Sequence, residues 1–394
     1  MTLLRRIVLW TIVAGVGAVS GLARAPRAEA QLVRAPARSV VDPRAAKPQG
    51  DLEAQRTGEA LYRDACAACH GPDGRGMPAE RVGFDTPLPD FTDCSFATRE
   101  PDADWFAVVH EGGPVRAFAR IMPAYGDALT DDEIAATLAY IRTLCTDDRW
   151  PRGELNLPRA LRTEKAYPED EAVFTTNVAL EGPSSVLNEL VYEKRFGARN
   201  QVELSVPFGV QGREAAGRSF RLGDVAIGVK RALFHSLARG TILSAAGEFV
   251  LPTGDRDDGF GSGTTMFEPF VALGQILPQD AFFQFQGGVE LPFDTDRADR
   301  AGFWRAALGR SFTEGGFGRV WTPMVELLGA RSLQRSGATE WGLLPQLQVT
   351  LSTRQHVMAN LGVEVPLNDG GPRPTRLWFY LLWDWFDGPL FEGW

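Results

Sequence analysis

The 394-residue sequence predicts two folded parts, a small all-α domain followed by an all-β antiparallel domain of about twelve strands. Three observations predict this class. Apolar residues recur at helical spacing within residues 51–148, whereas beyond residue 170 apolar and polar residues alternate with a period of two. A charged stretch with several prolines, residues 149–169, lies between the two patterns and is expected to be a linker.

The charge balance limits the classes of partner. The chain has 41 Lys+Arg against 50 Asp+Glu, a net charge of -9. Proteins that bind nucleic acids carry basic faces that replace phosphate counterions, so we expect no nucleic-acid partner. Four cysteines in a chain of this length exclude a disulfide-based scaffold.

The first 30 residues have the layout of a secretory signal peptide. Arg5 and Arg6 precede an apolar run over 7–23, and small residues end the segment at Ala28 and Ala30. An uncleaved membrane anchor is the alternative, since the run approaches the length of a spanning helix. Residues 31–50 are rich in Ala, Pro and Arg without periodicity and are expected to be a flexible tether. Export also permits disulfides.

The strongest motif lies in the helical part. Cys66 and Cys69, with His70 directly after, form a C-x-x-C-H sequence, the haem c attachment signature. Two thiols at this spacing reach the two vinyl groups on one porphyrin edge, and the histidine then lies under the iron as the proximal ligand. A chance match, a redox C-x-x-C and half of a zinc site are the alternatives. Zinc needs a second ligand pair, and the remaining cysteines lie far apart.

Helices are expected on both sides of this motif. Apolar residues at 58, 61, 62 and 65 share one helical face that leads into it. Near the end of the domain, Thr130 and Glu133 form a capping box that opens a second helix. The apolar stripe of that helix contains Ile134, Leu138 and Cys145.

With this order of features, residues 51–148 resemble a small class I cytochrome c. The resemblance implies an all-α domain that binds one covalent haem c and a methionine as the second axial ligand. Met122, in a Met-Pro-x-x-Gly segment, matches that position. Met77 and His110 are the rival ligands, and Met77 lies too close to His70 in sequence to cross the haem easily.

Cys94 and Cys145 remain after the haem motif. In an oxidising compartment two leftover cysteines in one small domain favour a disulfide, which would tie the loop after the motif to the last helix. Two buried free thiols are the alternative.

Residues 170–394 predict an outer-membrane β-barrel. Their period-two segments suit the 9–11 tilted residues that cross a membrane, and turn-rich stretches separate them. The predicted strands are 171–182, 188–197, 201–211, 222–234, 241–252, 264–276, 281–293, 302–313, 318–331, 339–352, 355–368 and 375–386. A soluble β-sandwich also alternates but rarely needs so many strands.

Aromatic residues favour the barrel over the sandwich, because barrels carry aromatic girdles at both membrane interfaces. Aromatics crowd the end of the chain: Trp378, Phe379, Tyr380, Trp383, Trp385, Phe386, Phe391 and Trp394. A terminal aromatic resembles the assembly signal of bacterial outer-membrane proteins. Segments such as GDVAIGVKRALF, GEFVLPTGD and GGVELPF resemble the outer-membrane transporter family associated with phenol degradation.

Acidic residues recur on the polar faces of these segments, and they either line an acidic, cation-favouring lumen or lie at the rims. They are Glu203, Asp224, Glu248, Glu290, Glu326 and Glu364.

Together these features predict a haem c electron-transfer protein anchored in the outer membrane. A barrel of about twelve strands is too narrow to enclose the helical domain, so we expect that domain at the periplasmic mouth. Its partners would be periplasmic redox proteins and outer-membrane lipid. The architecture also resembles fused cytochrome–porin iron oxidases, so outer-membrane Fe(II) oxidation is the enzyme alternative. A porin that its haem domain gates or senses is the third interpretation.

Overall fold

The computed structural model describes residues 56–182, 184–213, 217–257, 259–334, 337–368 and 373–384. The predicted signal peptide (1–30), the tether (31–50) and the last ten residues with their aromatic end lie outside the described residues. Within the described ranges, no helix has the length and apolar character needed to cross a membrane. The described residues all belong to one compact unit.

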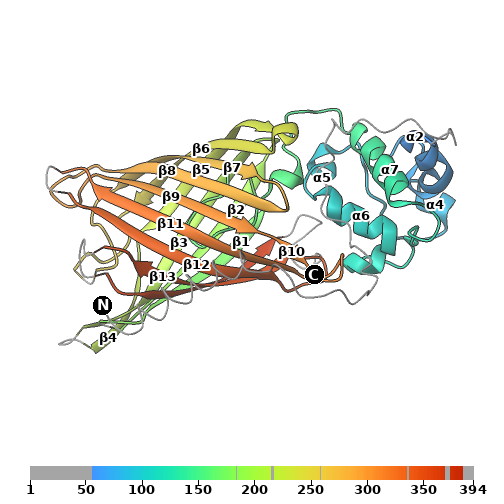
Figure 1. The fold of residues 1–394 in the computed structure, drawn as a ribbon. Helices are drawn as coiled ribbons and strands as arrows, with labels where there is room; N and C mark the ends of the chain where they lie inside the picture. Colours follow the sequence, from blue (N-terminus) through green and yellow to red (C-terminus); the bar gives the residue numbers. More distant parts are fainter. Residues whose placement is uncertain are drawn as a thin grey trace, which may run out of the picture. The chain divides into compact units, whose positions relative to one another are not determined.

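The first described part is helical, as the sequence predicts (Figure 1). A capping box at Thr130 and Glu133 opens its longest helix, as expected, and Ile134, Leu138 and Ile141 on the buried face of that helix join the core of the domain. The helices are α2 (Gly58–Leu61), η1 (Tyr62–Cys66), α3 (Ala67–His70), α4 (Ala79–Val82), α5 (Cys94–Ala97), α6 (Asp102–Glu111), η2 (Gly113–Arg116) and α7 (Asp131–Thr143).

The second part is a closed antiparallel barrel of twelve strands, which confirms the predicted fold class. Its strands are β1 (Glu171–Ala179), β2 (Ser185–Phe196), β3 (Asn200–Arg213), β5 (Val225–Ser236), β6 (Thr241–Leu251), β7 (Met266–Ile276), β8 (Ala281–Pro292), β9 (Ala301–Arg310), β11 (Val320–Ser332), β12 (Thr339–Thr350), β13 (Val357–Pro366) and β14 (Arg376–Asp384). Each pairs with its neighbours, and β1 pairs with β14 to close the barrel.

Two further short strands lie outside this ring. β4 (Gly217–Leu222) pairs with the end of β3, and β10 (Phe312–Thr313) pairs with the start of β11. The prediction of a single strand over 222–234 therefore starts too early. The strand is interrupted at Gly223, between β4 and β5, where a Cβ would lie 2.9 Å from the Pro207 ring.

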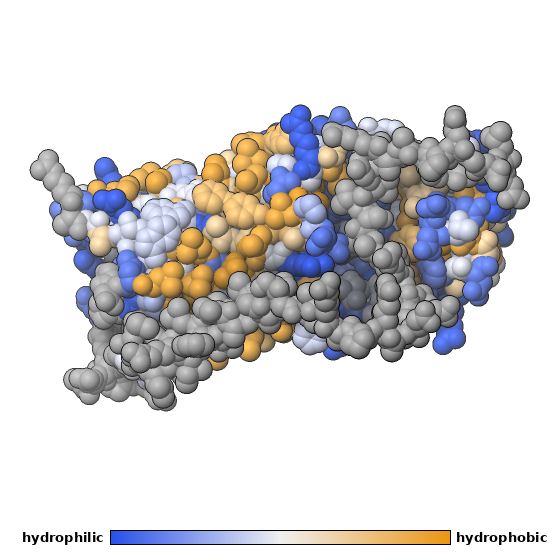
Figure 2. Space-filling view, viewed as in Figure 1, coloured by the Kyte–Doolittle hydropathy of each residue, from blue (hydrophilic) through white to orange (hydrophobic). Residues whose placement is uncertain are grey.

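The barrel has the polarity of a membrane protein. Large apolar side chains face outward, as Figure 2 shows along the strands, and polar ones face the lumen. Exposed examples are Leu204, Ile227, Val229, Leu308 and Leu361; buried examples are Gln201, Ser244, Gln284, Gln286, Gln346 and Asn360. A soluble sandwich would reverse this arrangement, so the alternative is wrong.

Exposed aromatics lie near strand ends, among them Phe196, Phe249 and Trp321, as a membrane girdle requires. The expectation that the terminal aromatics belong to this girdle is wrong for Trp378 and Tyr380. These two side chains are buried on the inner side of the barrel. The physical reason is that Tyr380 donates a hydrogen bond inward, to the carbonyl of Arg159 (2.7 Å).

The segment between the two parts, residues 151–170, fills the barrel lumen at the end where β1 begins; we call it the lumen plug. All its residues are buried or half-buried. Hydrogen bonds and ion pairs join it to inward-facing side chains of ten strands: Glu171, Glu193, Gln201, Lys230, Ser244, Gln284, Gln286, Arg305, Glu326, Gln346 and Tyr380.

The other two strands contact the plug through glycines. A Cβ on Gly274 of β7 would lie 3.1 Å from Leu157 Cδ1, and one on Gly362 of β13 would lie 2.6 Å from Leu161 Cδ1. The missing side chains let these leucines approach the wall. The plug therefore contacts all twelve strands of the ring.

Candidate functional site

The C-x-x-C-H motif lies where the first helical run ends. This run is a continuous helical stretch that passes through a π-helical turn, η1, before α3, and it stops at Gly71, whose φ is +77°. Single π-helical turns are common at functional sites because they re-aim side chains. Here the turn ends on Cys66, and α3 carries Cys69 and His70.

The two motif cysteines are half-buried free thiols, not a disulfide. Burial raises the pKa of the Cys66 thiol to about 11. A redox-active C-x-x-C lowers the pKa of its reactive cysteine, and a zinc site needs thiolates. The surroundings of Cys66 therefore favour neither alternative.

His70 has the properties of a neutral imidazole ligand. Its ring stacks on Phe91 with the ring centroids 4.9 Å apart, and its Nδ1 is buried without a hydrogen-bond partner. Burial lowers the pKa of His70, which keeps the ring neutral. The Tyr62 hydroxyl holds the end of the motif by donating to the Gly71 carbonyl (2.7 Å).

Met122 lies in a segment that is fastened to the motif helix. The Tyr125 hydroxyl donates to the Ala65 carbonyl (2.7 Å), directly before Cys66. Met122 and Cys66 pack against the same apolar cluster. The segment is also held on α6, because the Tyr125 amide donates to the Val109 carbonyl (2.9 Å). Met122 is thus brought near the motif although 52 residues separate it from His70 in the sequence.

The rival ligands have other surroundings. His110 Nδ1 lies 2.8 Å from a Glu111 carboxylate oxygen, and its Nε2 lies 3.8 Å from Asp131. The Met77 amide donates to the Cys69 carbonyl (2.8 Å), so its backbone stays beside the motif. These contacts agree with the expectation that Met77 lies too close to the motif to cross a haem.

Cys94 and Cys145 form a disulfide in the structure, with a Cα–Cα distance of 5.1 Å. The pairing is the predicted one, but it joins the N-terminal residue of α5 to the chain just after α7, whereas Cys94 was expected in a loop and Cys145 on the last helix. Helices α2 and α7 also pack closely: a Cβ on Gly58 of α2 would lie 2.0 Å from the Ala136 carbonyl oxygen of α7.

The helical domain contacts the barrel at the plug end. Arg99 pairs with Asp170 at 2.5 Å, and Arg116 donates to the carbonyl of Phe317 at 2.7 Å. Asp170 directly precedes β1, and Phe317 lies between β10 and β11. The linker predicted over 149–169 thus connects two parts that also touch directly.

The acidic residues predicted on the polar faces divide into groups. Glu326 is buried and accepts from the Thr163 amide (2.7 Å), so it holds the plug. Asp224, by contrast, holds a turn at the opposite rim by accepting from the Ser262 amide (2.7 Å). The prediction that acidic residues line the lumen is therefore correct for Glu326. The alternative, that they lie at the rims, is correct for Asp224. Sequence patterns gave no signal for the plug, because its residues follow neither helical nor strand periodicity.

Comparison with known proteins supports the cytochrome part of this description. Residues 53–141 match the family model of cytochrome c oxidase, cbb3-type, subunit III. The chain matches no curated protein. Among solved structures, an outer membrane channel from Pseudomonas putida F1 is 14% identical and aligns over 58% of this chain and 99% of that chain, with a TM-score of 0.43.

Two porins give similar values. The KdgM porin is 8% identical over 55% of this chain and 99% of that chain, with a TM-score of 0.38. The NanC porin is 10% identical over 54% of this chain and 98% of that chain, with a TM-score of 0.39. The chain thus combines a cytochrome c-type domain, whose family implies haem c binding, with a closed twelve-stranded antiparallel barrel.

Proposed function

We propose that this protein is a haem c electron-transfer protein that its β-barrel anchors in the outer membrane, with the haem domain in the periplasm. The observation that carries the proposal is a C-x-x-C-H motif in a cytochrome c-type domain joined to a barrel with an apolar outer face. When bound, the haem iron supplies one-electron chemistry by cycling between Fe(II) and Fe(III).

In this proposal Cys66 and Cys69 would hold one haem covalently, and His70 and Met122 would coordinate its iron. Three features support it: the free thiols, the neutral buried imidazole with no partner on Nδ1, and the packing of Met122 with the motif helix. A thioether axial ligand raises the reduction potential. The surrounding aromatic core, including Phe91 and Tyr62, would keep water from the macrocycle.

The periplasmic placement is supported by the turns of the barrel. β1 begins and β14 ends at one end, because Glu171 pairs with Asp384. Three hairpins at this end have connections of three or four residues, at 197–199, 237–240 and 277–280. The opposite end carries longer connections, such as 252–265 and 293–300. In outer-membrane barrels the short turns face the periplasm.

Proteoliposomes test the role. The full chain is inserted with a known orientation, and a membrane-impermeant reductant is added on one side. We expect the haem to be reduced only from the side of the short turns. Oxidation of Fe(II) on the opposite side with reduction of an acceptor inside would favour the iron oxidase instead, and solute flux that follows the haem state would favour the gated porin.

The ligand assignment has its own test. We expect Met122→Ala to abolish the methionine-to-iron charge-transfer band of the oxidised protein while haem stays covalently bound in a denaturing gel. Met77→Ala, the matched control, should keep the band. A band that persists in Met122→Ala refutes the assignment of Met122.

A further inference from the structure

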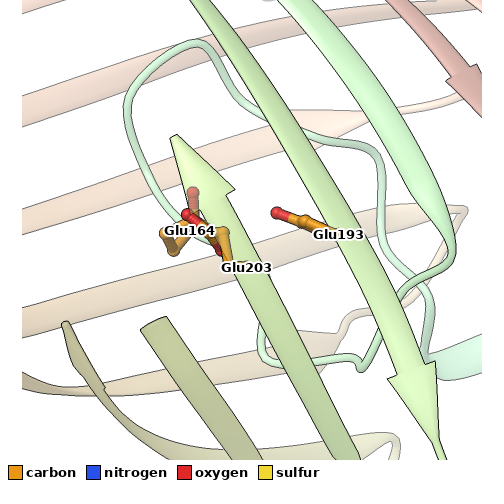
Figure 3. A group of neighbouring side chains, drawn as sticks. All are labelled: Glu164, Glu193 and Glu203. Carbon is orange, nitrogen blue, oxygen red and sulfur yellow. The ribbon is translucent and has the colours of Figure 1, made fainter. Parts of the chain in front are cut away.

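A second cluster of potential ligands lies in the lumen, away from the haem motif. Glu164 of the plug, Glu193 of β2 and Glu203 of β3 bring three carboxylate oxygens within 4.8 Å of one another (Figure 3). Glu193 and Glu203 are direct partners across the β2–β3 ladder. The plug supplies the third side chain, so the cluster exists only with the plug in place.

The hydrogen bonds leave oxygens of this cluster unused. Arg159 binds one oxygen of each of two carboxylates, Oε1 of Glu164 (2.9 Å) and Oε1 of Glu193 (2.8 Å). The Oε2 atoms of Glu164 and Glu193 are both buried without a hydrogen-bond partner. The Glu193 side chain is 0% exposed, and Figure 3 shows its carboxylate pointing toward the other two.

A buried carboxylate oxygen without a partner is costly, because it has lost its water and gained nothing. Among the described residues the nearest amine does not remove this cost. Lys230 Nζ lies 3.8 Å from Glu164 Oε2 and donates its hydrogen bond to the Lys165 carbonyl instead (3.0 Å). Within the described part of the chain, Glu203 receives one hydrogen bond, a long one of 3.4 Å from the Gln201 side-chain amide.

In a neighbouring cluster the chain places its own cation against the carboxylates, although Glu169 Oε1 and Asp384 Oδ1 are also buried without a hydrogen bond. Glu169, Glu171 and Asp384 also bring three carboxylates together. There the Lys165 ammonium pairs with Glu169 and lies 3.1 Å from Glu171. Among the described residues, the cations within 4 Å of these six carboxylates are Arg159, Lys165 and Lys230, and Arg305 acts on Glu164 from farther away. In the Glu164 cluster Lys230 is the neighbouring ammonium, but its Nζ makes no hydrogen bond to the unused oxygens of Glu164 and Glu193.

An acidic row leads from this cluster toward the other end of the barrel. Glu203 is opposite Gly228 of β5, Gly228 is opposite Glu248 of β6, and Glu248 is opposite Glu268 of β7. Glu248 and Glu268 each lie near the strand end opposite the plug. Because barrel strands are tilted, a row across the ladder climbs along the axis. Carboxylates in a row favour cations along that path.

We propose that Glu164, Glu193 and Glu203 bind one hard divalent cation in the lumen. Oxygen-only carboxylate ligands suit Mg²⁺, Ca²⁺ and Mn²⁺, whose remaining positions water can fill. The cation takes the unused Oε2 atoms of Glu164 and Glu193, and it ties the plug to two strands of the wall. This site does not depend on the proposed electron-transfer function, since none of its ligands belongs to the haem domain.

Mn²⁺ serves as the probe. The full haem-loaded chain in detergent is stripped with a chelator and titrated with Mn²⁺, and the room-temperature EPR signal of free Mn²⁺ reports binding. We expect one Mn²⁺ to bind per chain and Mg²⁺ or Ca²⁺ to compete. Changes to outer-shell partners alone weaken metal sites about 10- to 100-fold, so Glu203→Gln, which removes a direct ligand, should weaken binding at least tenfold.

Glu268→Gln is the matched control, an inward-facing glutamate of the same row outside the cluster, and it should keep the wild-type affinity. The haem spectrum and heat-modifiable gel migration show that each variant is folded. If Glu203→Gln does not fold, Glu164→Gln on the plug replaces it. Three results overturn the proposal: no bound Mn²⁺ in the wild type, equal affinity in Glu203→Gln, or equal loss in Glu268→Gln, which would indicate diffuse lumenal charge.

Discussion

The plug depends on Arg159, so removing this side chain should release it. Arg159 lies 2.9 Å from Glu164, 2.6 Å from Glu171 and 2.8 Å from Glu193, and the guanidinium side chain is 9% exposed. The three carboxylates hold the pKa of Arg159 well above its usual value. In Arg159→Leu these three carboxylates would lose the guanidinium that pairs with all of them.

Removing one partner of a buried ion pair costs about 3–5 kcal/mol. Since about 1.4 kcal/mol corresponds to a tenfold change in an equilibrium, the ratio of docked to released plug should fall by roughly two to three and a half powers of ten. Mutating Glu193 to Gln in the same chain should restore part of this loss, because one unpaired charge is then removed as well.

Planar-bilayer conductance of the full chain measures the release. We expect steady low conductance for the wild type and frequent openings for Arg159→Leu, with heat-modifiable gel migration confirming an intact barrel. Arg162→Leu is the matched control. Arg162 also belongs to the plug, but its guanidinium lies over the Trp378 ring, 4.7 Å from the centroid, and forms no ion pair within the part of the chain that the structure describes. Identical conductance in Arg159→Leu and the wild type refutes the reasoning.

Other predictions concern the helical domain. Gly58→Ala should destabilise it by about 1–3 kcal/mol through overpacking, since the new methyl would meet the Ala136 carbonyl at 2.0 Å; thermal melting followed at the Soret band measures this, and an unchanged melt would contradict the close crossing of α2 and α7. Replacing Cys94 and Cys145 by Ser opens a loop with a sequence separation of 51. The chain-entropy model then gives a loss of about 4 kcal/mol, which chemical denaturation of the pair variant checks against the oxidised wild type. Thr130→Ala removes the N-cap of α7 and should cost about 1 kcal/mol, whereas Thr143→Ala at the far end of that helix is the neutral control.

The strand pattern was predictable because one physical rule sets it. Each strand separates lipid from a polar lumen, so the predicted 241–252 and 281–293 differ from β6 and β8 by one residue at one end. The rule fails where the chain leaves the bilayer. β4 lies outside the ring and pairs antiparallel with the end of β3, a contact that no two-residue period records.

The haem motif was readable for a different reason. In c-type cytochromes thioether attachment requires the C-x-x-C-H spacing, and Cys66, Cys69 and His70 carry this signature within five consecutive residues. Met122 needed the resemblance to a family, since only the fold brings it near the motif. The plug offered neither signal: the same prolines and charges are typical of an exposed linker. The plug differs from an exposed linker through its contacts with the lumen wall. Its backbone amides donate hydrogen bonds to Glu326, Gln286 and Gln346 of the wall.

The contacts of the polar side chains in the lumen help to decide whether the barrel serves as an anchor or as a pore. In an open channel these side chains would face water and solute. Here those at the end where β1 begins bind plug atoms, including backbone amides and carbonyls that would otherwise lie unpaired inside the barrel. Displacing the plug would leave both the wall side chains and the plug backbone groups without their partners. Solute could therefore pass only if contacts to all twelve strands of the ring were broken. The plug is also continuous with α7 through only seven residues, 144–150. A barrel used in this way holds the haem domain at one mouth, and the fold therefore favours an anchor for electron transfer over a gated porin.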